Sequence, residues 1–170
     1  MAARRRRPVK RADERVLVLA LLPILALVGV AVLAREWVPR AGPLVTVHRT
    51  LHCHCCVRWV RHPERSGFKV ETHITDSLAD VRARFGVAPA LASCHTAVID
   101  GLVIEGHVPA EDLRLALERR DASGLAVPGM PAGSPGMEGA RMTPYDVAAW
   151  TSHGRQWRYA HHAVEVPDAR

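Results

Sequence analysis

The chain has 170 residues and a formal net charge of +6, a balance that raises the question of a nucleic-acid partner. The excess lies in residues 1–15, which carry seven Lys/Arg and two Asp/Glu and leave 16 Lys/Arg against 15 Asp/Glu for the remaining chain. Membrane topology and anionic lipid head groups account for such a basic run, so we exclude nucleic acid as a partner. The sequence contains no nucleophile elbow, phosphate-binding loop or apolar pair of carboxylates, which argues against a hydrolase.

An uncharged run of 19 residues, 16–34, follows the basic segment. At about 1.5 Å per residue, a helix of this length crosses a hydrocarbon core of roughly 30 Å, so the run predicts a transmembrane anchor. The preceding positive charge predicts that residues 1–15 lie in the cytoplasm and that everything after Trp37 lies on the extracytoplasmic side. A cleaved signal peptide is the alternative, since small residues stand near Ala34. Both versions export the rest of the chain, beginning with a linker at 35–43.

A single domain is expected at 44–160, with a tail at 161–170. Its predicted elements are a strand at 44–48, a helix from the cysteines to Ser66–Gly67, a strand at 68–74, a helix capped by Asp76 or Ser77 and stopped by Gly86, a hairpin at 97–104 turning at Asp100–Gly101, and a helix opened by Pro109. A proline- and glycine-rich loop at 129–137 and a hairpin at 145–150 and 156–159 follow. The order β-α-β-α-β-β-α, with a Cys-x-x-Cys between the first strand and the first helix, is typical of an α/β, thioredoxin-like domain.

Three of the four cysteines, Cys53, Cys55 and Cys56, lie within four residues at that junction, while Cys94 stands alone. Unpaired backbone N–H groups and the positive end of the helix dipole stabilise thiolates there, which serves metal binding and disulfide exchange alike. In a thioredoxin-like fold the segment entering the third strand lies against the N-terminus of the first helix. We therefore expect Cys94 to complete the cluster.

The spacing of the cysteines favours copper over zinc. The adjacent side chains of Cys55 and Cys56 are expected to diverge, which suits thiolates that bridge several ions better than the four ligands around one zinc ion. Thiolates are soft ligands and favour Cu(I). Three alternatives stay open: a thiol-disulfide or copper-coupled oxidoreductase, a structural zinc site, and plain disulfides in an exported domain. The oxidoreductase is disfavoured because no proline stands beside Cys94, where such enzymes carry a cis-proline facing the active-site pair.

Histidines and methionines form a second set of candidate ligands, which comprises His54, His95, His107, Met130 and Met137. Each histidine, taken singly, is more often a surface or hydrogen-bonded residue than a ligand. The methionines lie in the 129–137 loop, where they either bind Cu(I) as a transfer site or fasten the loop onto the domain.

Four motifs follow one another along the domain: Cys53-His54-Cys55-Cys56, Ser93-Cys94-His95-Thr96-Ala97, Ile104-Glu105-Gly106-His107-Val108-Pro109 and the stretch 124–138. Together they resemble the metal-binding family that includes the CopG-type bacterial copper-resistance proteins, over roughly residues 44–160. The resemblance implies a thioredoxin-like fold and exported copper handling, with the four cysteines at the ligand positions. The family usually has glycine where this chain has His54, so His54 either strains a backbone of positive φ or adds a ligand.

We therefore predict a membrane-tethered, exported Cu(I)-binding protein for copper tolerance or delivery, with a multinuclear site held by Cys53, Cys55, Cys56 and Cys94. Its expected partners are copper ions, the membrane and a copper-handling protein. We expect a binding protein rather than an enzyme, with the thiol-disulfide or copper-coupled oxidoreductase as the alternative.

Overall fold

The computed structural model describes residues 42–139 and 141–163. The predicted anchor at 16–34 lies outside these ranges. Within them, every helix is too short or too polar to span a membrane.

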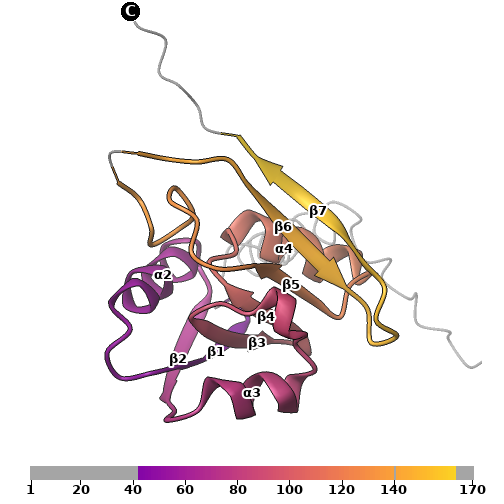
Figure 1. Ribbon diagram of the computed structural model, residues 1–170, viewed down its shortest axis with the longest axis horizontal. Coiled ribbons are helices and arrows are strands. Elements are labelled where there is room, and N and C mark those ends of the chain that lie inside the picture. The colour runs from indigo at the N-terminus through magenta and orange to yellow at the C-terminus, as the bar shows by residue number, and fades with distance from the viewer. Residues whose placement is uncertain (1–41, 140, 164–170) are drawn as a thin grey trace, which may run out of the picture. The chain divides into compact units, whose positions relative to one another are not determined.

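A seven-stranded sheet in the order β2-β1-β3-β4-β5-β6-β7 forms the centre of the described fold (Figure 1). Neighbouring strands run parallel in the pairs β1/β2 and β4/β5, and antiparallel in the others. The strands are β1 (Leu44–Arg49), β2 (Lys69–Ile74), β3 (His95–Ile99), β4 (Leu102–Gly106), β5 (Gly124–Val127), β6 (Tyr145–Trp150) and β7 (Gln156–His162).

Helices cover both faces of the sheet (Figure 1). They are α2 (His54–Arg65), α3 (Leu78–Phe85) and α4 (Ala110–Arg119), with a short 3-10 turn at Pro89–Leu91. Trp59 of α2 and Leu113 of α4 belong to the larger hydrophobic core on one face. Phe85 of α3 packs against a second core on the other face, which includes Val103 and Trp150. The fold is thus a mixed α/β arrangement of three layers.

The predicted elements from the first strand to α4 are confirmed in type and order. Ser77 caps α3, because its Oγ accepts a hydrogen bond from the backbone N–H of Asp80 at 3.2 Å. Gly86 ends the same helix in the left-handed region, with φ of 68°. The hairpin turn has positive φ at both central residues, Asp100 (47°) and Gly101 (85°), as a two-residue turn between twisted strands requires.

The strand β5 was not predicted. It lies between β4 and β6, and all four of its residues are buried. A strand buried on both faces has no alternation of polar and apolar residues, and Gly124 begins it. The four-residue segment therefore carries no periodic pattern that marks it as a strand.

Two side chains of α2 fix the start of α4. The indole Nε1 of Trp59 donates to the carbonyl oxygen of Val108 at 3.0 Å. The imidazole Nε2 of His62 accepts from the backbone N–H of Ala110 at 2.9 Å and so caps a helix that Pro109 cannot cap with its own side chain. Burial lowers the pKa of His62, which keeps Nε2 free to accept. The helix that carries the cysteines is thereby fixed to the segment that follows His107.

Candidate metal centre

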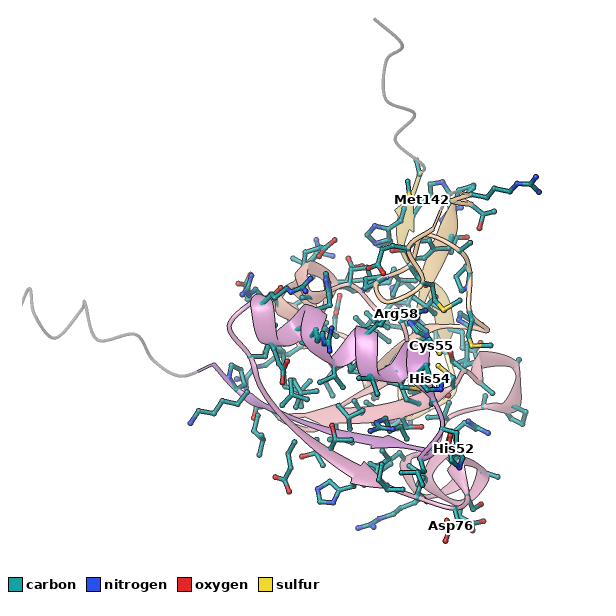
Figure 2. The ribbon with its side chains drawn as sticks, turned by 90° about the vertical axis from the view of Figure 1, so that its left-hand side faces the viewer. His52, His54, Cys55, Arg58, Asp76 and Met142 are labelled. Carbon is teal, nitrogen blue, oxygen red and sulfur yellow. A yellow bond between two sulfur atoms is a disulfide. The ribbon has the colours of Figure 1, made fainter. Side chains whose placement is uncertain are left out.

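The helix α2 begins inside the cysteine motif. Cys53 is the N-cap residue, and its Sγ accepts a hydrogen bond from the backbone N–H of Cys56 at 3.3 Å. Figure 2 shows His54 and Cys55 at this N-terminal end, with His52 on the turn before them and Arg58 further along the helix. The local sequence thus places sulfur atoms where the first N–H groups of the helix point.

The structure brings the four cysteines together, with all four sulfur atoms within 4.8 Å of one another. Cys53 and Cys56 form a disulfide, while Cys55 and Cys94 are outside any disulfide. The Sγ of Cys94 lies 3.6 Å from that of Cys55 and 3.5 Å from that of Cys56. The Sγ of Cys55 also lies 3.5 Å from that of Cys53. We call these four sulfurs the sulfur cluster.

Cys55 and Cys56 are adjacent on the first turn of α2, and their side chains were expected to diverge. Successive residues of a helix point about 100° apart, so the two side chains do leave the helix in different directions. Cys94 enters from the segment before β3 and lies within reach of both. Both sulfurs therefore face one shared partner, which the sequence spacing alone does not indicate.

His107 adds an imidazole to the sulfur cluster. Its Nε2 lies 3.0 Å from the Sγ of Cys94, and its Nδ1 lies 2.7 Å from the carbonyl oxygen of Pro135. A carbonyl oxygen only accepts, so Nδ1 carries the proton and donates it. Burial lowers the pKa of His107, which favours the neutral ring with its Nε2 lone pair toward Cys94. A hydrogen bond from the far nitrogen to a carbonyl is how metal-ligating histidines are usually oriented.

His95 is fully buried beside the sulfur cluster. Its Nδ1 lies 3.5 Å from the Sγ of Cys94, and its ring centroid lies 4.3 Å from that of Trp59. Its Nε2 has no hydrogen-bond partner among the residues that the structure describes. Burial, and then the neighbouring His107, lower the pKa of His95 well below its usual value, so this ring is also neutral. Cys94, His95 and His107 form a second group whose ligand atoms lie within 4.8 Å of one another.

The loop at 129–137 brings Met130 to the sulfur cluster. The Sδ of Met130 lies 3.8 Å from the Sγ of Cys55. The loop is fixed at one end by a hydrogen bond from Ser93 Oγ to the carbonyl oxygen of Gly129, and at the other by Arg58 Nε, which donates to the carbonyl oxygen of Gly136 at 2.7 Å. Gly136 has φ of 83°, and a Cβ there would lie 2.7 Å from the backbone nitrogen of Trp59. Only glycine permits this approach of the loop to α2.

Two candidate ligands are not brought to the sulfur cluster. In the described part of the chain, neither His54 nor Met137 makes a hydrogen bond or sulfur contact with it. His54 is exposed on the first turn of α2. It is not among the residues of positive φ, so the strain considered for this position is absent.

The Cys94 thiol differs electrostatically from a thiol at a helix N-terminus. Burial, followed by the neighbouring Cys55, raises the pKa of Cys94 to about 12. The expected stabilisation of thiolate therefore does not extend to this cysteine, which comes from the segment before β3 rather than from the helix end. A metal ion that takes this sulfur displaces its proton.

Sequence reasoning missed Glu105, which lies beneath the segment that carries Cys94. Its carboxylate is fully buried and accepts hydrogen bonds from Ser93 N at 2.7 Å and Thr96 Oγ1 at 2.6 Å. Arg82 of α3 adds an ion pair at 3.4 Å. Burial raises the pKa of Glu105, and these hydrogen bonds oppose the shift. The available signal was a single acidic residue within the apolar strand Leu102–Gly106.

The chain is similar to a known protein family and to solved structures. Residues 91–137 match the family model described as "Protein of unknown function, DUF411". No curated protein matches the chain. Two solved structures of copper resistance protein CopG, termed form 1 and form 2, are each 46% identical to the chain, and each match covers 71% of this chain and 98% of the other. Their TM-scores are 0.68 and 0.69. On this identity and coverage, the chain belongs to the family of the CopG copper resistance proteins.

Proposed function

We propose that the protein binds copper as Cu(I) at the sulfur cluster and serves copper tolerance or delivery. The observation that carries the proposal is the convergence of Cys53, Cys55, Cys56 and Cys94, whose sulfurs lie within 4.8 Å of one another. Thiolates and thioethers are soft ligands, and Met130 adds a thioether at the edge of the cluster. The name of the related solved structures, copper resistance protein CopG, supports the same metal.

The proposed site holds more than one copper ion. The four sulfurs are joined by Met130 and by the ring nitrogens of His95 and His107. These donors exceed the four that one tetrahedral ion takes, so a single ion would leave some of them unused. The Sγ of Cys94 faces both Cys55 and Cys56, which makes it the natural bridging sulfur. Use of all four thiolates requires two-electron reduction of the disulfide between Cys53 and Cys56.

Copper analysis of the reduced full-length chain tests this proposal. We expect more than one copper ion per chain after competition with a Cu(I) chelator, and X-ray absorption with sulfur as the main scatterer. Zinc supplied in place of copper is the control, and it should be displaced by Cu(I). One ion per chain would contradict the multinuclear site, and loss of all copper to the chelator would contradict copper binding itself.

We further propose that the fold is thioredoxin-like. Support comes from the order β2-β1-β3-β4, in which only β1 and β2 are parallel, and from the Cys-x-x-Cys at the start of α2. The strands β5, β6 and β7 then extend the sheet beyond such a core.

A thiol-disulfide or copper-coupled oxidoreductase is the second candidate function. The observation that favours it is the placement of two thiols against the disulfide: Cys55 Sγ lies 3.5 Å from Cys53 Sγ, and Cys94 Sγ lies 3.5 Å from Cys56 Sγ. A thiolate at either position could attack the nearer sulfur and displace the other. The argument against it is that Cys94, which lies 3.5 Å from Cys56 and 3.0 Å from His107, stands where such enzymes carry the cis-proline that faces the active-site pair.

We propose that residues 16–34 anchor the protein and that the cysteine domain lies on the extracytoplasmic side, where a copper-handling partner exchanges the ion with it. The basic residues 1–15 and the uncharged run support this topology, and disulfides persist in oxidising compartments. Met130 is 52% exposed, which suits transfer to a partner. Protease added to intact cells with a permeable outer layer should remove the domain and leave the anchor in the membrane. A soluble form beginning near Arg35 would indicate cleavage, and full protection would contradict export.

A further inference from the structure

The sulfur cluster depends on the position of the segment that carries Cys94. Cys94 precedes β3, and its Sγ is the atom that faces Cys55, Cys56 and His107, at 3.6, 3.5 and 3.0 Å. The other three cysteines belong to the start of α2 and share its backbone. A small displacement of the segment would therefore separate Cys94 from its neighbours.

Glu105 holds this segment on both sides of Cys94 in the sequence. Its Oε1 accepts from the backbone N–H of Ser93, one residue before, and its Oε2 accepts from the hydroxyl of Thr96, two residues after. Thr96 and Glu105 are also direct partners in the antiparallel pairing of β3 and β4. The two carboxylate oxygens thus fix the residues that flank Cys94.

Arg82 of α3 binds the other backbone group of Ser93, its carbonyl oxygen. Its Nη1 donates to the carbonyl oxygen of Ser93 at 3.1 Å and lies 3.4 Å from Oε1 of Glu105. Both the N–H and the C=O of Ser93 are therefore bound by this pair. Glu105 makes these contacts without touching a sulfur of the cluster, so it is not a ligand.

A buried carboxylate destabilises a fold unless donors satisfy it, so an apolar residue would complete β4 at lower cost. We propose that Glu105 is a positioning residue, which acts through Ser93 and Thr96 to hold the Cys94 sulfur against Cys55, Cys56 and His107. The effect on copper binding rests on the proposed function, whereas the effect on thiol placement stands without it.

The first experiment measures thiol placement in the metal-free, full-length chain. Mild oxidation of the reduced protein by oxidised glutathione should form disulfides between Cys94 and Cys55 or Cys56, read by mass spectrometry of peptides. We expect Glu105→Ala to lower the rate of these pairings about tenfold and to leave the Cys53 to Cys56 pairing unchanged. Glu105→Gln should restore most of the rate, because its amide can bond to Ser93 N and Thr96 Oγ1. The exposed Glu71→Ala is the matched control.

The second experiment uses a double-variant cycle with Cu(I) and a competing chelator. Glu105→Ala should weaken Cu(I) binding by about 10- to 100-fold, as loss of an outer-shell partner does. In a Cys94→Ser background the same change should have no further effect, because its route to the metal is gone. Should Glu105→Ala fail to fold, Arg82→Ala removes the bond to the carbonyl oxygen of Ser93 from a partly exposed position and takes its place.

The outcomes separate the inference from the proposed function. An unchanged rate of Cys94 pairing in Glu105→Ala, or equal slowing of the Cys53 to Cys56 pairing, would overturn the positioning role whatever copper does. Additive losses in the Cu(I) cycle would also overturn it, since they indicate general destabilisation. Absence of Cu(I) binding in the unmodified protein would overturn the proposed function while the pairing rates still decide the role of Glu105.

Discussion

Changing Cys94 to serine is expected to weaken Cu(I) binding by about a hundredfold or more. This loss exceeds the one expected when a residue that only orients a ligand is removed. The physical reason is that the Sγ of Cys94 contacts the free thiol of Cys55, the disulfide-bonded sulfur of Cys56 and the Nε2 of His107. A hydroxyl is a hard ligand and does not replace a bridging thiolate on Cu(I). The measurement is chelator competition on the reduced full-length chain.

Met142→Leu is the control for this prediction. It removes a sulfur that Figure 2 shows apart from Cys55, and we expect it to leave Cu(I) affinity unchanged. Disulfide exchange by Cys53 and Cys56, measured as the rate of insulin reduction, should persist in Cys94→Ser because both sulfurs remain. Unaltered copper affinity in Cys94→Ser would contradict the proposed site. Efficient exchange undiminished by bound copper would favour the oxidoreductase instead.

Changing Trp59 to alanine is expected to lower the free energy of unfolding by about 3–5 kcal/mol, the usual effect of removing a buried tryptophan side chain. Trp59 is fully buried in the larger core, donates to the carbonyl oxygen of Val108, and packs against the ring of His95. Its loss leaves a cavity between α2 and the sheet and an unpaired carbonyl at the start of α4. Denaturant unfolding of the full-length chain measures the effect.

Two further variants separate packing from hydrogen bonding at this position. Trp59→Phe keeps an aromatic ring beside His95 but removes the N–H donor, so we expect a smaller loss of about 1–3 kcal/mol for the unpaired carbonyl of Val108. Trp157→Ala removes a partly buried tryptophan of β7 and should cost less than Trp59→Ala. Equal losses in the two alanine variants would contradict the central position assigned to Trp59.

Local signals explain why much of the fold was predictable. The Ser77 cap depends on a side-chain oxygen that few residue types supply. The Gly86 stop and the Asp100–Gly101 turn depend on positive φ, which few residue types favour, so the sequence marks all three directly. The strand β5 gave no such signal, because its position is set by pairing with β4 and β6, which are distant in the chain. Boundaries fixed by local chemistry were therefore found, and an element fixed only by tertiary contacts was not.

The contacts of the candidate site also fall into those that the sequence predicts and those that it does not. The grouping of Cys53, Cys55 and Cys56 is local, and the approach of Cys94 follows from the fold expected for the element order. The contact of Met130 with Cys55 depends on where a loop of irregular backbone is fixed by Arg58 and Ser93. The helix or strand periodicity of apolar residues does not predict such a contact. It also does not predict that Glu105 supports the chain beneath Cys94.

The imidazole of His107 connects the loop to the sulfur cluster through its two nitrogens. Its Nδ1 holds the carbonyl oxygen of Pro135, and its Nε2 faces Cys94. Because a neutral ring carries one proton, the position of the loop decides which tautomer is favoured. Release of Pro135 would let the proton move to Nε2 and remove the lone pair that faces the sulfur. Occupation of Nε2 by an ion would, in turn, polarise the ring and strengthen the bond to the loop. The position of the loop and the position of the proton on this ring are therefore coupled.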